Sequence, residues 1–417
     1  MAFLQIEAAG GIVLLLATVA AMVWANSPER ASYTSFWHTS VALRAGGHGI
    51  TQDLRHWIND GLMTLFFFVV GMEIKTELVD GELRDRRAAV FPAVAAIGGM
   101  ALPALIYLII NGRGVGNAGW GIPMATDIAF ALGVVALLGS RVPQSLKVFL
   151  LTLAIVDDIG AIVVIAVFYS GGLAVAWLGL AAALLAFMSL LQRIHVRSLP
   201  VYAVLGCAVW FATFESGVHA TIAGVMLGLL TPARAHLPAD AAGEAAVDTI
   251  EASSDISIAD ARRVSYLTRE SVAVTERLMN ALHPWTSFVI IPLFALANAG
   301  IPLSRHSLAG GWSIAGGVVA GLVLGKVVGI SGAVWLALRF GLGSMPEGAT
   351  WRHVVGVAAL AGIGFTVSLF VADLAFADAD HRQQAKVGVL AASVLAAVLG
   401  SSLLVLAARR PPSDSTQ

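Results

Sequence analysis

The sequence predicts an all-α membrane protein with many transmembrane spans, and three observations support this class. Of the 417 residues, 58% are hydrophobic and only 12% are charged, whereas soluble domains carry about a quarter charged residues. The mean hydropathy is strongly positive. Apolar stretches recur along the whole chain, and most are about 18 residues or longer, the length that crosses a hydrocarbon core of ~30 Å as a helix.

We count twelve such stretches, and the division between the seventh and the eighth is the weakest because only Glu215 and Ser216 separate them. The predicted spans are residues 9–26, 57–79, 88–111, 119–138, 148–170, 172–192, 199–214, 217–231, 285–303, 312–338, 353–372 and 384–408. The leader before the first span lacks Lys and Arg, so we interpret that span as a retained helix rather than a signal peptide. Most Lys and Arg residues fall on the side of the N-terminus, which predicts that both termini are cytoplasmic.

Composition also excludes several kinds of protein. Cys207 is the only cysteine, so an intramolecular disulfide is excluded and a thiolate metal site is implausible. The net charge is −1, and nothing indicates a nucleic-acid partner. We expect one transmembrane domain at 1–410 that contacts the lipid bilayer, with a long cytoplasmic loop at 233–280 and a disordered tail at 411–417.

The fourth predicted span carries a buried acid beside helix-breaking residues. Gly121 and Pro123 come early in this span, and Thr126 and Asp127 follow near its middle. This pattern predicts a helix that is unwound at mid-membrane, where free backbone groups line a cavity. If that break meets another one, Asp127 could offset helix-end charges, a role that is structural as much as functional.

The fifth predicted span contains two adjacent aspartates in an otherwise uncharged run. A single Asp at the centre of a membrane helix costs roughly 2.5 to 3.5 kcal/mol, so a pair needs partners, protons or a polar cavity. We therefore interpret Asp157 and Asp158 as an ion or proton site. Carboxylate, hydroxyl and carbonyl oxygens suit a hard cation such as sodium, and two adjacent carboxylates cannot easily both be ionised at this depth.

The tenth predicted span carries Lys326, the one basic residue that we place at mid-membrane depth. A buried ammonium requires a carboxylate partner or loses its proton, and the buried aspartates are the obvious partners. A role in transport is favoured over a purely structural ion pair, because a structural pair can be replaced by apolar residues at little cost. The same helix carries a glycine at every fourth position, which we interpret as a close helix-packing surface. These residues are Gly317, Gly321, Gly325 and Gly329.

The eleventh predicted span repeats the interruption of the fourth. Gly362, Gly364 and Thr366 lie near its middle. Interrupted helices in corresponding positions of two halves indicate a transporter site between inverted repeats.

Two connections have patterns of their own. Residues 236–277 alternate acidic residues with Ala and Ser and end with three arginines, which we interpret as a flexible cytoplasmic linker with room for a short amphipathic helix; a plain linker is favoured over a regulatory element. Residues 40–54 have Gly-rich turn chemistry between apolar flanks, which permits a β-hairpin.

Ten short motifs, in order along the chain, resemble the NhaA-type bacterial sodium/proton antiporters. They are 57–60 (WIND), 70–75 (VGMEIK), 91–100 (FPAVAAIGGM), 125–133 (ATDIAFALG), 138–143 (LGSRVP), 155–158 (IVDD), 216–221 (SGVHAT), 282–285 (LHPW), 294–300 (FALANAG) and 362–366 (GIGFT). The resemblance runs from about residue 10 to residue 376, and the motifs together are very specific.

The resemblance implies inverted-topology repeats formed by spans 3–5 and 10–12, with spans 4 and 11 unwound where they cross. It implies that Asp158 is the principal sodium or lithium ligand. Asp157 would be a ligand or proton carrier that pairs with Lys326 when the cation is absent, and Thr126 and Asp127 would complete the polar wall of the site. These residues are then the candidate metal-binding and proton-binding set, with Na⁺, Li⁺ and H⁺ as transported ions and no cofactor.

The resemblance also suggests how pH acts on the transporter. Glu73, Lys75 and Glu77 at the inner end of span two match positions linked to pH response, and so does His219 at the start of span eight. An ordinary solvated helix end, and a hydrogen-bonded histidine near the membrane surface, are the simpler alternatives. Three residues depart from the family pattern and put the alkaline activation profile in doubt: Thr76, Met279 and Asn280.

The function that follows is electrogenic exchange of sodium or lithium for protons across a bacterial inner membrane, with a role in pH and sodium homeostasis. Asp60 would be a structurally significant acid near the outer end of span two, and an extracytoplasmic hairpin at 40–54 would mediate a homodimer. Three rivals are an organic-solute transporter of related fold, a passive cation channel and an intramembrane aspartyl protease. The protease would need its acids in a Gly-x-Gly-Asp setting, which does not occur.

Overall fold

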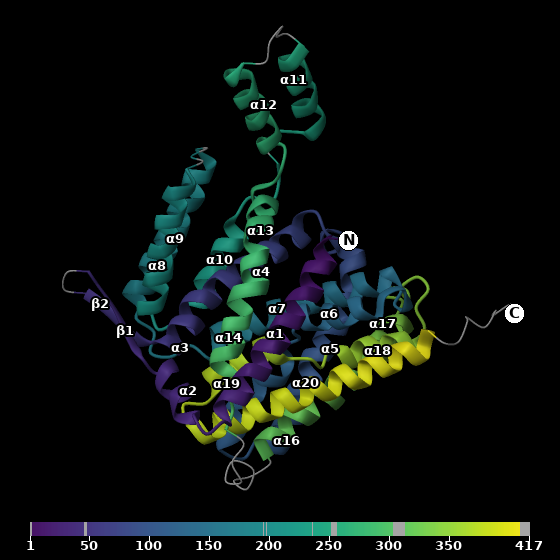
Figure 1. Ribbon diagram of the computed structural model, residues 1–417. Helices are drawn as coiled ribbons and strands as arrows, with labels where there is room; N and C mark the ends of the chain where they lie inside the picture. The colour runs from purple at the N-terminus through teal and green to yellow at the C-terminus, as the bar shows by residue number, and fades with distance from the viewer. Residues whose placement is uncertain are drawn as a thin grey trace, which may run out of the picture.

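A computed structural model of the chain describes residues 2–45, 48–194, 196, 198–235, 237–251, 257–302 and 313–408. Within these ranges all regular elements except two short strands are helices. The long helices pack side by side in one bundle, and a pair of short helices projects from one end of it (Figure 1). The helical, multi-span class predicted from composition is therefore confirmed. The predicted tail at 411–417 lies outside the described residues.

The elements follow the predicted order, and short 3₁₀ or π-helical segments are labelled η. The first half of the chain contains α1 (Ala2–Ala25), α2 (Arg30–Trp37), β1 (Ser40–Ala45), β2 (His48–Asp53), α3 (Leu54–His56), η1 (Trp57–Leu62), α4 (Met63–Val79), η2 (Glu82–Arg84), α5 (Arg86–Asn111), η3 (Val115–Met124), α6 (Ile128–Leu138), η4 (Gly139–Arg141), α7 (Gln144–Phe168) and α8 (Val175–Arg193). The second half contains α9 (Leu199–Glu215), α10 (Thr221–Leu230), α11 (Ala239–Glu251), α12 (Ile258–Glu270), α13 (Val274–Trp285), η5 (Thr286–Ile290), α14 (Ile291–Asn298), α16 (Ser313–Val319), η6 (Ala320–Gly325), α17 (Lys326–Arg339), α18 (Trp351–Leu360), α19 (Phe365–Ala375) and α20 (Ala379–Ala408).

Six helices in the described ranges are long and apolar enough to cross a membrane, and the number rises to nine if each of three bent helix pairs counts as one span. The two shorter apolar helices α9 and α10 occupy the predicted seventh and eighth spans. The total of twelve spans stays a prediction.

Two of the bent pairs lie in the predicted spans four and eleven. The axis turns by 43° between η3 and α6 and by 46° between α18 and α19. Pro123 lies one residue before the end of η3 and has no N–H to donate. In the second pair, Gly362 and Gly364 lie in the break itself. These breaks leave helix ends, with their free N–H and C=O groups, in the interior of the bundle.

The predicted span ten is one continuous helix from Ser313 to Arg339. Its middle turn, η6, is π-helical and ends at Gly325, directly before Lys326. The glycine side of this helix lies against α5, where a Cβ atom added to Gly325 would lie 2.7 Å from Pro103 Cα. The packing interpretation of the glycine stripe therefore agrees with the structure. A widened π-helical turn beside a functional residue is a recurrent arrangement.

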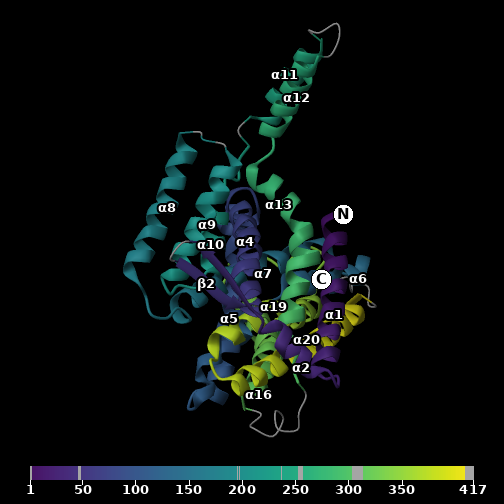
Figure 2. The same ribbon diagram turned by 60° about the vertical axis from the view of Figure 1, so that its left-hand side comes forward.

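The predicted loop at 233–280, where the sequence allowed for one short amphipathic helix, contains the two helices α11 and α12 and the start of α13. A capping box between Ser257 and Asp260 begins α12. The Leu237 N–H donates to Glu270 O at 3.1 Å and closes the base of the helix pair. The pair extends away from the bundle (Figure 1 and Figure 2). Acidic and Ala-rich composition was interpreted as linker because it resembles both disorder and an exposed helix.

The predicted ninth span also has different bounds, because the helix runs from Val274 to Asn298 rather than from 285 to 303. Hydropathy alone assigns α13, the first three turns of this helix, to the loop, because many of its residues are polar. An α-helix continues into water when its polar face is solvated, so hydropathy marks the membrane boundary rather than the helix start.

The two strands pair antiparallel, with Ser40 opposite Asp53 and Val41 opposite Gln52. Asp53 fixes their base: its Oδ2 lies 2.8 Å from His38 Nδ1, and its Oδ1 lies 2.6 Å from His56 Nδ1. Burial raises the pKa of Asp53, but hydrogen bonds from His56 and His38 outweigh it and leave the pKa below the usual value. The carboxylate form of Asp53 therefore ties the strands to α3.

Candidate cation site

The two helix breaks meet in the centre of the bundle and are joined by hydrogen bonds. The Asp127 N–H donates to Ile363 O at 2.6 Å. The Ser368 hydroxyl donates to Ile122 O at 2.7 Å, and the Thr126 hydroxyl lies 2.9 Å from Ala361 O. Each broken helix therefore provides hydrogen-bond partners for the free polar groups of the other, in the interior of the bundle where water is scarce.

Asp127 accepts hydrogen bonds at the start of both second half-helices. Its Oδ1 accepts from the Phe130 N–H at 3.0 Å and caps α6. Its Oδ2 accepts from the N–H and the hydroxyl of Thr366, in the first turn of α19, at 2.9 and 2.6 Å. Free N–H groups give a helix N-terminus partial positive charge, so a carboxylate between two such ends is stabilised. Both oxygens of Asp127 are engaged in holding the crossing together.

Lys326 contacts the opposite kind of helix end. Its side chain is fully buried, and Nζ donates to Met124 O, the last residue of η3, at 2.6 Å. Nζ also lies 3.0 Å from the Thr126 hydroxyl. Carbonyl groups at a helix C-terminus carry partial negative charge, which an ammonium offsets. The suggestion that Asp127 and Lys326 each offset one set of helix ends agrees with these contacts.

Asp157 forms an ion pair with Lys326, with Oδ2 and Nζ 2.6 Å apart and both side chains fully buried. The Thr126 hydroxyl also lies 2.8 Å from the same oxygen. The other oxygen, Oδ1, makes no hydrogen bond to any described residue. Oδ2 of Asp157 therefore pairs with Lys326, and Oδ1 has no hydrogen-bond partner among the described residues.

Asp158 has a different environment. Successive residues on a helix point about 100° apart, so the two carboxylates face different directions. Asp158 is 4% exposed, and its buried Oδ1 has no hydrogen-bond partner among the described residues. The charges that act on it come from Asp157, Glu73, Asp127 and Lys326. A buried carboxylate surrounded by more acids than bases favours a bound cation or proton.

The candidate pH-response residues fall into two separate places. Glu73 Oε1 lies 3.2 Å from His283 Nε2 on α13. Glu77 accepts the Glu82 N–H at 3.0 Å, and Lys75 on the same helix is partly exposed. These three candidates share the end of α4. The family resemblance did not predict His283 as a partner, although it lies in a quoted motif.

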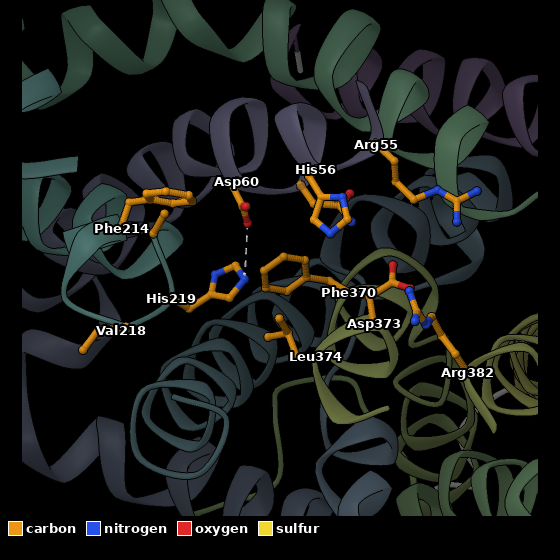
Figure 3. A pocket seen from close by; sticks show the side chains of 13 residues that line it. Arg55, His56, Asp60, Phe214, Val218, His219, Phe370, Asp373, Leu374 and Arg382 are labelled. Carbon is orange, nitrogen blue, oxygen red and sulfur yellow. Dashed lines mark ion pairs between the residues drawn. The ribbon is translucent and has the colours of Figure 1, made fainter. Parts of the chain in front are cut away.

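His219 lies elsewhere, in a cavity of about 270 Å³ that we call the hairpin-side pocket (Figure 3). Its Nε2 is 3.5 Å from Asp60 Oδ1, and its Nδ1 is 2.9 Å from the Thr221 hydroxyl. The pocket lining is Arg55, His56, Asn59, Asp60, Phe214, Gly217, Val218, His219, Ala220, Phe370, Asp373, Leu374 and Arg382. Because Asp60 and Glu73 are 13 residues apart on one span, His219 lies roughly 20 Å from the other candidates.

One buried network was missed by the sequence reasoning. Lys386 Nζ lies 2.7 Å from Asp373 Oδ1 and 3.4 Å from Asn298 Oδ1. The Asn298 amide in turn donates to Asn59 Oδ1 at 2.8 Å. The available signal was Lys386 itself, a lysine two residues into the predicted span 384–408.

Interrupted helices that enclose buried acids and a lysine define the class of the protein as a secondary transporter of the membrane. Comparison with known proteins then identifies the family. The model of the family Na+/H+ antiporter 1 matches residues 1–404. The chain therefore belongs to this family: it is an antiporter that exchanges Na⁺ for H⁺, and not an enzyme.

Named relatives agree with this assignment. The chain is 47% identical to the Na(+)/H(+) antiporter NhaA 2 of Myxococcus xanthus, over 98% of this chain and 90% of that protein. It is 47% identical to the Na(+)/H(+) antiporter NhaA of Rhodopirellula baltica, over 98% and 94%. Among solved structures, the sodium proton antiporter MjNhaP1 from Methanocaldococcus jannaschii at pH 8 superposes with a TM-score of 0.51 at 14% identity, covering 98% of this chain and 97% of that one. This likeness concerns the fold.

Proposed function

We propose that sodium or lithium and protons compete for the carboxylates of Asp157 and Asp158, and that this competition couples their transport. The observation that carries the proposal is a pair of buried oxygens that accept no hydrogen bond from any described residue, Oδ1 of Asp157 and Oδ1 of Asp158. A buried carboxylate oxygen without a donor is costly unless a cation or a proton reaches it.

The two aspartates have different roles in this proposal. Asp158 is the principal cation ligand, because no donor among the described residues occupies its buried Oδ1. Asp157 exchanges partners: it holds Lys326 when the cation is absent and releases it when the cation binds. Thr126 contacts both Lys326 and Asp157 and moves with that exchange. Asp127 maintains the crossing and the field around it.

Transport follows by alternating access. Only a site that is loaded with a cation or with protons reorients, because an empty set of buried acids is too costly. The family resemblance implies that more than one proton moves per cation, so we infer that exchange is electrogenic. Membrane potential then contributes to driving it.

The wider architecture that fits this mechanism has twelve spans in one domain at 1–410, with inverted repeats in spans 3–5 and 10–12 and unwound spans 4 and 11. The 43° and 46° bends at corresponding places support it. We infer residence in a bacterial inner membrane with both termini in the cytoplasm. The strands β1 and β2 would then be extracytoplasmic and form the contact of a homodimer.

Regulation by pH would act at the cytoplasmic end of α4. The 3.2 Å contact between Glu73 and His283 supports this place, because Glu73 is also one of the charges that act on Asp158. Lys75 and Glu77 lie along the same helix end. His219 would act separately, through Asp60 in the hairpin-side pocket.

The deciding experiment measures dissipation of an imposed proton gradient in proteoliposomes after addition of sodium, lithium or potassium, across pH. We expect sodium and lithium to dissipate the gradient and potassium to have no effect. Asp158→Asn should abolish the response while the protein remains folded and reconstituted. Exchange at the wild-type rate in Asp158→Asn would contradict the proposed site but not the family assignment.

A further inference from the structure

The segment η3, the first half of one broken helix, is a 3₁₀ helix of ten residues that ends at Met124. Runs of 3₁₀ helix longer than three or four residues are uncommon, because their hydrogen-bond geometry is poor. A segment of this kind shifts easily unless side chains hold it from outside. Its last carbonyl accepts a hydrogen bond from Lys326, so the position of η3 bears directly on the cation site.

Four side chains from four different segments donate hydrogen bonds to carbonyl groups of η3. Two of them, Ser368 and Lys326, act near its end and belong to the helix crossing. The other two are Tyr107 and Tyr169, and they act on its first half. The crossing therefore holds one end of η3, and the two tyrosines hold the other.

Tyr107 holds the start of η3 from α5. Its side chain is fully buried, and its hydroxyl donates to Gly116 O at 2.8 Å. A Cβ atom added to Gly119 would collide with that hydroxyl, so this glycine lets the tyrosine reach the backbone. A buried hydrogen bond of this kind fixes both groups, because loss of the hydroxyl leaves the carbonyl without a donor.

Tyr169, directly after α7, holds the middle of η3 at two points. Its hydroxyl donates to Ala118 O at 2.7 Å and accepts the Gly121 N–H at 3.1 Å. A 3₁₀ turn joins each carbonyl to the N–H three residues later, so Tyr169 contacts both partners of one such turn. A Cβ atom added to Gly121 would lie 2.8 Å from the Tyr169 hydroxyl oxygen, so this approach also requires a glycine.

The end of η3 shares the Lys326 ammonium with the cation site. Nζ donates to Met124 O and to Asp157 Oδ2, both at 2.6 Å, and lies 3.0 Å from the Thr126 hydroxyl. These three acceptors match the three N–H groups of an ammonium. If η3 shifts and Met124 O withdraws, the ammonium loses one acceptor and interacts more strongly with Asp157. A cation must then displace a tighter ion pair.

We propose that Tyr107 and Tyr169 are positioning residues that set the affinity of the site for sodium and lithium. They hold η3 in its 3₁₀ form, which keeps Met124 O on the Lys326 ammonium. The partners of both hydroxyls are backbone groups of η3, so the tyrosines act on the cation through that segment. The inference rests on the cation site proposed at the two adjacent aspartates.

Packing alone is the alternative role of these tyrosines, and the two roles change different kinetic parameters. A loosened fold lowers the amount of active protein, and with it the maximal rate, but leaves the apparent KM for sodium as it was. Loss of positioning strengthens the ion pair between Lys326 and Asp157 in the empty site and raises the KM. At saturating sodium the pair is already broken, so the maximal rate per folded protein changes little.

The test uses the full chain in proteoliposomes and measures dissipation of an imposed proton gradient over a range of sodium concentrations. Tyr107→Phe and Tyr169→Phe remove the hydroxyl and keep the ring, so both variants should fold. Each should raise the apparent KM for sodium several-fold, and the double variant should raise it further. Titration calorimetry with lithium in detergent should show the same loss of affinity without transport.

The matched control is Tyr33→Phe. The Tyr33 hydroxyl also donates to a backbone carbonyl, Leu296 O at 2.9 Å, and accepts a backbone N–H, that of Gly300, at 3.2 Å. The residue is 3% exposed, but it belongs to α2 and contacts the end of α14 rather than η3. Tyr33→Phe should lose stability at an unchanged KM.

An unchanged KM in both single variants and in the double variant would refute the positioning role. An equal rise of the KM in Tyr33→Phe would refute it as well, because the effect would then come from general loosening. Failure of the cation site looks different: exchange at the wild-type rate in Asp158→Asn overturns the site whatever the tyrosine variants do. Normal KM values in the tyrosine variants beside an inactive Asp158→Asn protein overturn the positioning role alone.

Discussion

At the residue scale, two charges of opposite sign stabilise opposite ends of the broken helices. Asp127 receives donors from the starts of α6 and α19, whereas Lys326 donates to the carbonyl that ends η3. The lysine has a second partner, Asp157, and so connects the framework of the crossing to the proposed exchange site. Asp127 makes no hydrogen bond to Asp157 or Asp158 among the described residues and acts on Asp158 only through its charge, so its contacts favour a framework role.

Asp127→Asn should destabilise the crossing by about 1–3 kcal/mol. The amide oxygen can still cap α6, but the amide NH₂ now faces the Thr366 N–H, which is left without an acceptor in a buried place. Thermal unfolding in detergent measures the loss. Asp80→Asn, at an exposed helix end, is the control and should be neutral. Equal unfolding temperatures for both variants would contradict the framework role.

Lys326→Met should destabilise by about 3–5 kcal/mol, because it leaves the fully buried Asp157 carboxylate without a cation. Adding Asp157→Leu removes the uncompensated charge and should recover most of that loss, while exchange stays abolished. Thermal unfolding of the two single variants and the double variant forms a complete cycle. Additive losses would mean that the pair contributes no coupling energy.

At the element scale, the helix of span ten positions Lys326 by close backbone contact with α5. Gly325 precedes the lysine and touches Pro103, so the π-helical turn and the ammonium are held at a fixed distance from the crossing. Small residues permit such contact in a membrane, where packing rather than hydrophobic burial drives association.

Gly325→Ala should therefore destabilise by about 1–3 kcal/mol and slow exchange, because the added Cβ would lie 2.7 Å from Pro103 Cα and the helices must separate. Gly332→Ala on the same helix is the control. No atom lies within 4 Å of its added Cβ, so it should be neutral or slightly stabilising through better helix propensity. Thermal unfolding and sodium-driven proton release provide the two readouts, and identical behaviour of both variants would exclude the contact as a determinant.

The α11 and α12 pair projects away from the bundle (Figure 1). Its ends meet at the hydrogen bond between Leu237 and Glu270, 3.1 Å apart. Replacing residues 238–269 with a short Gly-Ser connection should leave exchange rates and the unfolding temperature unchanged, since a short loop closes this distance at little entropic cost. Exchange measured in proteoliposomes checks this. A lost or pH-shifted activity would show instead that the pair regulates the transporter.

At the scale of the whole molecule, the sequence predicted that the intramembrane charges are paired, but it did not predict the positions of cavities. Lys326 had to pair with a buried acid, and breaks rich in Gly had to expose helix ends, so these contacts followed from solvation physics. The hairpin-side pocket could not be predicted, because it depends on how η1, the turn before α10 and α19 pack. For residues 236–277 the sequence allowed for one short helix in a linker, but it did not predict the pair α11 and α12, because exposed Ala-rich helices and linkers have similar composition.

Orientation in the membrane follows from the charge distribution and can be tested on the whole chain. Seven predicted spans separate Val41 on β1 from Asp248 on α11, so an odd number of crossings places them on opposite sides, with Asp248 in the cytoplasm. Cysteines at these two exposed positions, each in a Cys207→Ser background, report the side through a membrane-impermeant maleimide. Val41→Cys should react in intact cells, whereas Asp248→Cys should react only in inverted vesicles. Labelling of both from the same side would mean an even number of crossings and would contradict the twelve-span arrangement.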